Sequence, residues 1–157
     1  MTRLHVPIPL RWGDLDAFNH VNNAAMLKLL EEARVRVFWI PTIASEEVPS
    51  TAVIDASLEA ETLTLVAHQE IEYLAPIPYQ RDPLDVQLWM GKIGGASLQV
   101  AYEVFSPAGA GEQTLYARAS TTVVMVDSTT MKPRRISDTE RAAWEPYLED
   151  PIVFSRR

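Results

Sequence analysis

The sequence predicts an α+β domain in which one early helix packs against a long antiparallel sheet. Apolar residues recur at helical spacing over residues 26–40, and from about residue 63 onward their period changes to two, as in strands. No repeat, linker or low-complexity tract interrupts the 157 residues, so we expect a single domain spanning 1–157. Because the helix is apolar on several sides, a curved sheet wrapped around it would bury it most simply.

Composition narrows the class of protein. A hydrophobic share of 47% and a charged share of 22% are ordinary for a globular domain. The net charge of −7 argues against a general nucleic-acid-binding protein, which would carry a basic face. The absence of cysteine excludes disulfides, thiolate zinc sites and cysteine nucleophiles. With neither a secretion signal nor an apolar run of ~20 residues, we expect a cytoplasmic protein without a membrane partner.

The helix is predicted from one apolar stripe. Lys28, Glu32 and Arg36 lie off this stripe, and Glu32 precedes Arg36 by the favourable interval of four residues. Pro41 cannot continue a helix, so we expect the helix to end there. The stripe consists of Met26, Leu29, Leu30, Ala33, Val37 and Ile40.

Four strands follow an irregular segment over residues 41–61. Gly94 and Gly95 form a tight turn, so the second and third strands form a hairpin. Ser137 and Glu140 have the spacing of a capping box, which predicts a short helix reaching Tyr147. The expected strands cover residues 63–73, 84–90, 98–104 and about 114–126.

The approach to the first helix is unusually polar. A helix N-terminus needs one or two capping side chains. Here six polar residues lie within ten positions, separated by aromatic and apolar residues, which suggests a site as well as a cap. They are Asp14, Asp16, Asn19, His20, Asn22 and Asn23.

These residues carry a family resemblance. The run RWGDLDAFNHVNNAAMLKLLEEAR, residues 11–34, resembles the signature of hotdog-fold acyl-CoA thioesterases of the 4-hydroxybenzoyl-CoA thioesterase-like branch. In that signature, Arg-aromatic-x-Asp-x-Asp-x-x-Gly-His-Val-Asn-Asn enters the central helix. The later segments IEYLAPIP, LDVQLWMGKIGGASLQVAYEVF and ARASTTVVMVDSTTMKPRRIS resemble the family's strands, so the resemblance covers roughly residues 3–148. It implies the hotdog fold, a long central helix wrapped by a curved antiparallel sheet.

The sequence departs from the family pattern at two single residues and in one three-residue segment. Asn19 stands where glycine is usual, which bears on the turn geometry, although asparagine tolerates a left-handed backbone. Met26 replaces an aromatic residue and alters the wall of the acyl pocket. Gln80, Arg81 and Asp82 stand where Gly-Asp is common. None of these changes removes a residue that the family uses for chemistry.

The resemblance implies hydrolysis of acyl-CoA thioesters to a free acid and CoA, without a cofactor. Asp16 matches the family's catalytic carboxylate, a general base or a nucleophile. The backbone N–H of Asn23 matches the oxyanion hole at the helix N-terminus. His20 is a candidate for ordering water or positioning Asp16.

Each of these residues also has a purely structural interpretation. Asp14 can bond turn amides or Arg11, and this role is favoured over catalysis. Asp16 can form an Asx-turn, His20 can pack beneath the turn, and Asn22 is the best N-cap candidate.

Metal binding is a weaker hypothesis. Asp14, Asp16 and His20 could in principle hold a divalent ion, but the family chemistry needs none. His68, Glu70 and Glu72 share one strand face, which is more often solvated than metal-binding. We therefore predict no metal site.

Substrate contacts are assigned on the resemblance and on charge. Asn22 and Met26 would contact the acyl group, and Ser97 would contact CoA beside the Gly95 backbone. Arg134 and Arg135 would hold the CoA phosphates. Further cationic candidates at the rim are Arg81, Lys92 and Lys132.

Two other functions remain open. A hotdog-fold hydratase has its Asp and His separated by four residues, whereas five residues separate Asp14 from His20 and three separate Asp16 from His20. Neither spacing matches, so the hydratase is the less favoured of the two. A non-catalytic acyl-ligand or assembly module would retain the fold alone. In each case we expect a homodimer or homotetramer, because a single sheet leaves an edge uncovered. Asp16 would then face residues 59–64 or His68 of the second copy.

Overall fold

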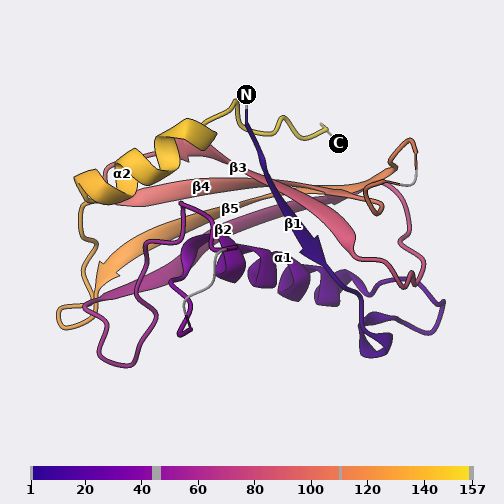
Figure 1. The fold of residues 1–157 in the computed structure, drawn as a ribbon, viewed down its shortest axis with the longest axis horizontal. Coiled ribbons are helices and arrows are strands. Elements are labelled where there is room, and N and C mark those ends of the chain that lie inside the picture. The colour runs from indigo at the N-terminus through magenta and orange to yellow at the C-terminus, as the bar shows by residue number, and fades with distance from the viewer. Residues whose placement is uncertain (1, 44–46, 110, 156–157) are drawn as a thin grey trace.

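The computed structural model describes residues 2–43, 47–109 and 111–155. A helix lies along one face of an antiparallel sheet, and a second, shorter helix lies at one end of it (Figure 1). In chain order the elements are β1 (Leu4–Ile8), the 3₁₀ turn η1 (Trp12–Asp14), α1 (Asn23–Phe38), β2 (Thr62–Tyr73), β3 (Leu84–Ile93), β4 (Ser97–Phe105), β5 (Leu115–Asp127), α2 (Asp138–Trp144) and the 3₁₀ turn η2 (Glu145–Tyr147).

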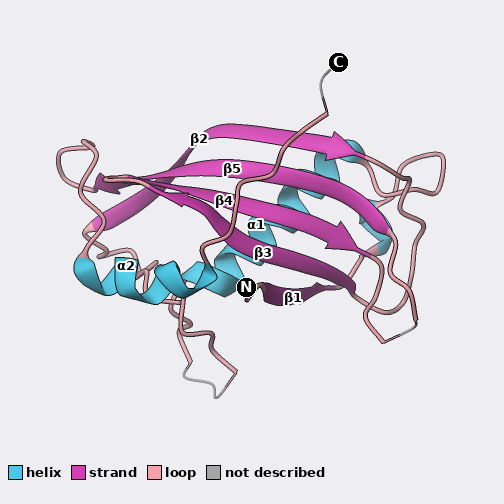
Figure 2. Ribbon diagram, turned by 90° about the horizontal axis from the view of Figure 1, so that it is seen from above, coloured by secondary structure: helices cyan, strands magenta, loops and turns pink. Residues whose placement is uncertain are grey.

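The sheet has five strands in the order β1-β3-β4-β5-β2, and every pair is antiparallel (Figure 2). The four strands expected from the apolar alternation are present, as is the β3–β4 hairpin. The alternation did not predict β1, a five-residue strand that contains Pro7. Proline is tolerated there because β1 is an edge strand, where a missing N–H breaks no central ladder.

Helix α1 is shifted from the predicted range of 26–40. It begins at Asn23 because the Asn22 side chain accepts a 2.8 Å hydrogen bond from the Ala24 amide. It ends at Phe38, before Pro41. The helix stops there because the following residues pair with the segment around Ile54: the Ile40 amide donates to the Ile54 carbonyl at 2.8 Å. Ile40 is consequently half exposed, outside the buried stripe.

The core lies between α1 and the facing side of the sheet. Met26, Leu30 and Val37 of α1 are almost fully buried there, as the helical stripe predicted. In the single chain the sheet covers one side of this 16-residue helix. The structure thus confirms the predicted α+β class. In a single chain, however, the sheet does not wrap around a long central helix, as the hotdog arrangement had implied. No helix in the described ranges is long and apolar enough to cross a membrane.

The C-terminal helix confirms the capping box. The Ser137 hydroxyl accepts from the Glu140 amide at 3.1 Å, and Glu140 accepts from the Ser137 amide at 2.8 Å. The α-helix ends at Trp144 and continues as η2 to Tyr147. The Trp144 ring packs edge-on against Phe38 with centroids 5.5 Å apart, which joins α2 to the end of α1.

Strand β2 changes face halfway along its length. Its pairing with β5 has an irregularity between Val66 and His68, and this bulge reverses which residues point toward α1. Leu63 and Leu65 therefore lie on the outer face and stay exposed, whereas Ile71 lies on the inner face and packs against the core. The sequence alternation implied one continuous face, which is wrong at this point.

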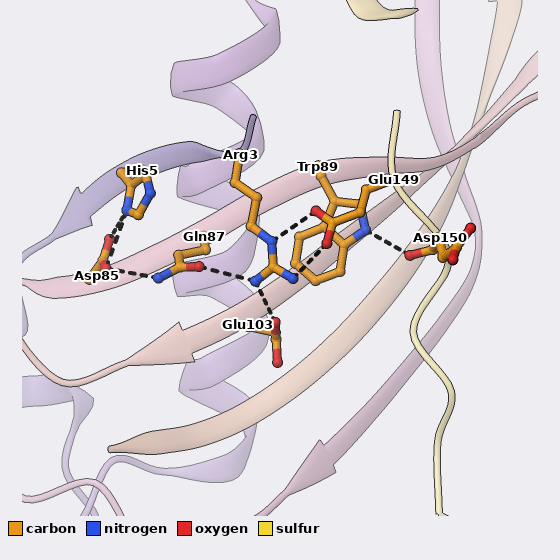
Figure 3. A network of polar contacts seen from close by, with 8 residues as sticks. All are labelled: Arg3, His5, Asp85, Gln87, Trp89, Glu103, Glu149 and Asp150. Atoms are coloured by element: carbon orange, nitrogen blue, oxygen red, sulfur yellow. Dashed lines mark hydrogen bonds and ion pairs between the residues drawn. The ribbon is translucent and has the colours of Figure 1, made fainter. Parts of the chain in front are cut away.

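The outer face of the sheet carries the C-terminal segment. The Arg3 guanidinium bonds Gln87, Glu103 and Glu149 and lies 3.9 Å from the Trp89 ring centroid (Figure 3). The Trp89 indole N–H donates to the Asp150 carbonyl at 3.0 Å. These contacts hold the chain after η2 against the sheet.

Candidate active site

Four residues singled out by the sequence line one pocket of about 330 Å³ at the N-terminal end of α1. They are Asp16, His20, Asn23 and Met26. The other walls come from the end of β2 and the segment after it, from the residue two positions before α1, and from β5. They are Val21, Tyr73, Leu74, Ala75, Pro76, Ile77 and Tyr116. A carboxylate, an imidazole and a helix N-terminus thus share one mostly apolar hollow.

Asp16 is held by a tight turn. Its Oδ1 accepts hydrogen bonds from the amides of Phe18 at 2.8 Å and His20 at 3.3 Å. The Asp16 amide donates to the His20 carbonyl at 2.8 Å, which closes the turn. This is the predicted Asx-turn. Oδ2 has no hydrogen bond to any described residue, so one carboxylate oxygen is left to act on a ligand.

The turn requires a left-handed residue at the position that departs from the family pattern. Asn19 has a φ of 62°, in the region that glycine adopts freely. Asparagine is one of the few other residues that tolerate it. The replacement of glycine by Asn19 therefore preserves the turn that holds Asp16.

The first turn of α1 leaves an amide unused. The Asn22 side chain caps the amide of Ala24 at 2.8 Å, which confirms its predicted N-cap role. The Asn23 amide has no acceptor among the described residues, as expected for the first residue of a helix. The positive end of the helix dipole favours an anion at this amide.

Asp14 has the structural role that the sequence favoured. Its side chain is buried, with 4% of the residue exposed. Oδ2 accepts from the Arg11 amide at 2.8 Å and Oδ1 from the Arg11 guanidinium at 3.2 Å. Asp14 does not line the pocket of Asp16.

The predicted CoA contacts lie at the other end of the sheet. Ser97 pairs with Val124 at the start of β4, and Arg134 donates to the Thr62 hydroxyl at 2.8 Å, at the start of β2. The Asp16 pocket lies at Tyr73, the last residue of this 12-residue strand. At about 3.3 Å per residue, β2 spans roughly 36 Å at most from Thr62 to Tyr73, so Arg134 lies far from the Asp16 pocket of its own chain. Ser97 lies three residues further along β2, in the row of Val124 and Leu65.

Arg134 is already engaged. It forms a two-pronged ion pair with Glu140, with N–O distances of 2.7 and 2.8 Å. Burial alone would raise the pKa of Glu140, but the hydrogen bonds from Arg134 and the Ser137 amide outweigh it, so this pKa lies below its usual range. Arg135 is exposed, and its side chain has no described partner. Of the two arginines, Arg135 is the one available to a ligand.

Metal-binding clusters are not found. No group of three or more His, Asp or Glu side chains in the described ranges could hold a metal ion. His68 lies 3.9 Å from Glu70, but Glu72 is buried and pairs with Arg118. A larger hollow of about 910 Å³ lies between β1 and the end of α1, but it has no carboxylate beside a helix N-terminus.

Two tyrosines at the pocket were not predicted. The Tyr73 hydroxyl donates to the main-chain carbonyl of Asn23 at 2.7 Å, and burial raises the pKa of this phenol. The Tyr116 hydroxyl accepts from the Gln80 amide at 3.1 Å. Both tyrosines come from strands, and nothing in their sequence neighbourhood distinguishes them from packing residues.

The chain is similar to known proteins both in sequence and in structure. The sequence model of the Thioesterase-like superfamily matches residues 10–144. No curated protein sequence gives a significant match. Solved structures do match over most of the chain.

Three of these structures illustrate the similarity. The PA2801 protein of Pseudomonas aeruginosa, a candidate thioesterase, is 28% identical, with 90% of this chain and 98% of that chain covered and a TM-score of 0.72. A thioesterase from Thermus thermophilus, crystallised with coenzyme A and zinc, is 26% identical, with 92% of each chain covered and a TM-score of 0.67. The dynemicin thioesterase has a TM-score of 0.76 over 94% of this chain and 99% of that chain, but at 14% identity it shows the fold alone.

Proposed function

The chain belongs to the thioesterase-like superfamily, and on that premise we propose that it hydrolyses acyl-CoA thioesters to a free acid and CoA. The observation that supports this most strongly is the pocket shared by Asp16 and the first turn of α1. Thioester hydrolysis needs a basic or nucleophilic oxygen on one side of the carbonyl and a donor for the developing oxyanion on the other. Asp16 Oδ2 and the Asn23 amide are suited to these two roles.

In the proposed reaction the thioester carbonyl oxygen points at the Asn23 amide. As a general base, Asp16 removes a proton from the attacking water, the C–S bond breaks, and the proton passes to the departing CoA thiolate. As a nucleophile, Asp16 attacks the carbonyl carbon and expels the CoA thiolate as the C–S bond breaks, which leaves an acyl anhydride. Water then hydrolyses the anhydride, which restores the Asp16 carboxylate and supplies the proton taken up by the CoA thiolate. His20 would order the water in either route. Both routes give a carboxylic acid and free CoA.

The proposal includes a homodimer. Strand β2 is an open edge with exposed Leu63, Leu65 and Val66 along it. Two copies related by a two-fold axis would pair their β2 strands antiparallel, so the Thr62 end of one strand would lie beside the Tyr73 end of the other. The joined sheet would wrap around the two α1 helices, which become the long central helices of the hotdog arrangement. A tetramer of two such dimers is compatible with this edge pairing.

The dimer also explains where the predicted CoA contacts lie. Ser97, Arg134 and Arg135 stand near the Thr62 end of β2, far from the Asp16 pocket of their own chain. Edge pairing would bring them toward the Asp16 pocket of the second copy. We infer that Arg135 meets the CoA phosphates there and that Asn22 and Met26 meet the acyl group. The coenzyme A bound to the Thermus thermophilus thioesterase supports CoA as the carrier.

The test is a panel of acyl-CoA thioesters incubated with the purified protein and a thiol reagent. Release of free CoA supports the proposal. Hydration of an enoyl-CoA without thiol release would indicate a hydratase instead. Binding without turnover would indicate a non-catalytic acyl-ligand module. Light scattering at micromolar concentration tests the dimer, and a monomer would contradict the two-chain site.

A further inference from the structure

A second hollow, of about 300 Å³, lies between the C-terminal half of α1 and the inner face of the sheet. It shares no lining residue with the Asp16 pocket. Most of its lining is apolar, including Phe38, Val66, Leu98, Val123 and Met125. The polar residues that line it are Glu31, Arg34 and Thr64. A cation in a hollow lined mainly by apolar residues needs a physical explanation, because a guanidinium group loses hydration there.

Arg34 is that cation, and its side chain is 11% exposed. Its Nη1 donates to the Tyr102 hydroxyl at 3.0 Å and more weakly to the Thr121 hydroxyl at 3.5 Å. Tyr102 donates in turn to Thr121 at 3.2 Å, and Thr121 to the side-chain carbonyl of Gln69 at 3.3 Å. All of these acceptors are neutral. They satisfy hydrogen bonds without balancing the charge of Arg34.

The nearest carboxylate balances it poorly. Glu31 lies 3.7 Å from Arg34 Nη2, and its side chain is 67% exposed, so the pair is solvated and weak. No described residue accepts a hydrogen bond from Arg34 Nε or Nη2. Every fully buried side-chain nitrogen or oxygen in the described ranges has a partner, so these two unpartnered nitrogens keep some solvent access and can be reached by a ligand. A guanidinium fork with free N–H groups fits a carboxylate in two-pronged geometry.

We propose that this hollow binds the carboxylate of a small, largely apolar organic acid, with Arg34 as the anchor. The ligand carboxylate would complete the charge balance, and its hydrocarbon or aryl part would contact Phe38, Val66 and Met125. A volume of about 300 Å³ is at the lower end of small-molecule sites, which limits the ligand to a short chain or a single ring. Carboxylate binding at this hollow does not depend on the proposed thioester chemistry, whereas the assignment of that carboxylate to an acyl-CoA substrate rests on it.

The same carboxylate chemistry has two possible sources. It can belong to a free acid that binds on its own. It can also be the far end of a dicarboxylic acyl group whose thioester reacts at the Asp16 pocket of a second copy. The second source is geometrically open, because Thr64 and Val66 line the hollow near the Thr62 end of β2, the end that edge pairing brings toward that pocket.

Calorimetric titration of the wild-type protein tests the site without any activity assay. Hexanoate, hexanol and hexylamine have the same chain and differ in the head group. We expect hexanoate to bind at least about tenfold more tightly than hexanol, because its carboxylate would form charge-assisted hydrogen bonds with the Arg34 guanidinium. We expect hexylamine, whose head group is a cation, not to bind. Equal affinity for hexanoate and hexanol, or no binding of hexanoate at millimolar concentration, would overturn the proposal.

Variants then assign the binding to this hollow. Arg34→Gln should weaken hexanoate binding at least about tenfold. Because Arg34 also ties α1 to the sheet, Val66→Phe provides a second test that fills the hollow from an exposed strand position. The matched control is Leu65→Phe, because the side chain of residue 65 points to the opposite face of β2, away from the hollow. We expect Val66→Phe to lose hexanoate binding and Leu65→Phe to retain it. Binding that survives Val66→Phe would place the ligand elsewhere and refute the site.

Kinetics with adipoyl-CoA and hexanoyl-CoA separate the two sources. If the carboxylate is the far end of an acyl group, Arg34→Gln should lower the ratio of kcat/KM for adipoyl-CoA to that for hexanoyl-CoA at least about tenfold. An unchanged ratio together with charge-selective hexanoate binding identifies a free acid. If no acyl-CoA is hydrolysed, the proposed function fails while the calorimetric result stands. If neither the ratio nor the binding depends on Arg34, the site is refuted.

Discussion

The Tyr73 hydroxyl donates a 2.7 Å hydrogen bond to the main-chain carbonyl of Asn23 and so ties the edge strand β2 to the first turn of α1. The Asn23 amide also has no acceptor among the described residues. The bond therefore anchors the helix end that would stabilise an oxyanion. The Tyr73 phenol is protonated at neutral pH and can keep donating, since its ordinary pKa of about 10 is raised further by burial.

Tyr73→Phe removes this bond and keeps the ring. We expect kcat to fall roughly three- to tenfold with little change in KM, since a net hydrogen bond contributes about 0.5–1.5 kcal/mol. Steady-state kinetics with the best acyl-CoA of the panel measures both constants. Tyr79→Phe is the matched control, because the Tyr79 ring packs edge-on against Trp12 and its hydroxyl has no hydrogen bond to a described residue. Equal losses in the two variants would remove Tyr73 from the positioning of the site.

Asp14→Asn should mainly lower stability. The Asp14 carboxylate accepts from the amide and the guanidinium of Arg11, and asparagine can serve only one of them while it presents its NH₂ to the other. We expect a loss of about 1–2 kcal/mol in the free energy of unfolding, measured by urea denaturation. Asp55→Asn is a control on an exposed turn, where Asp55 accepts from the Ser57 amide. A loss no larger than that of the control would contradict the role given to Asp14.

Glu140 should contribute to acid sensitivity. Its pKa lies below the usual range in the folded protein, so its contribution to stability is present above the unfolded pKa and is lost as pH falls through the folded value. Glu140→Gln should therefore be less stable than wild type at neutral pH. Between about pH 6 and about pH 3 it should also lose less stability than wild type does.

Thermal unfolding across this pH range measures both effects of Glu140→Gln. The control is Glu145→Gln, a change at an exposed carboxyl. Parallel pH curves for wild type and Glu140→Gln would show that the pair with Arg134 does not stabilise the fold.

The two neighbouring arginines should behave differently when their charge is reversed. Arg135→Glu should raise KM for acyl-CoA roughly two- to fivefold and weaken its salt dependence, because its exposed side chain is free to meet a phosphate. Arg134→Glu should lower the melting temperature first, since it breaks the ion pair with Glu140. An unchanged KM and salt dependence in Arg135→Glu would remove this group from the CoA site.

Much of the fold was readable from apolar periodicity. The stripe from Met26 to Val37 and the strands β3, β4 and β5 each bury a face, and burial imposes the period. Strand β2 alternates in sequence but stays largely exposed at the sheet edge. β1 was not predicted, because a strand of five residues that includes a proline shows too little apolar alternation to be recognised. The bulge near Val66 was not predicted, because it is a property of the pairing of β2 with β5 and not of the local sequence. The resemblance to hotdog-fold thioesterases is confirmed by the family match and the solved structures.

The candidate site was readable only where it is local in sequence. Asp16, His20, Asn23 and Met26 belong to one short run, and the fold brings them to one pocket. Their chemical roles remain predictions. Tyr73 and Arg34 could not be singled out, because their importance comes from partners 50 and 68 residues away. In sequence they resemble an ordinary strand tyrosine and an ordinary helix arginine.

The central claim is that Asp16 supplies the catalytic carboxylate. Asp16→Asn keeps the Oδ1 acceptor of the turn but removes the charge and the basic oxygen, so the fold should persist. The decisive measurement is kcat for Asp16→Asn beside Asp14→Asn, with the same acyl-CoA and conditions. We predict a fall in kcat of ~10²–10⁴-fold for Asp16→Asn, roughly 3–5 kcal/mol of transition-state stabilisation, with activity largely retained in Asp14→Asn. Retention of more than about a tenth of wild-type kcat in Asp16→Asn, with activity abolished in Asp14→Asn, would contradict it.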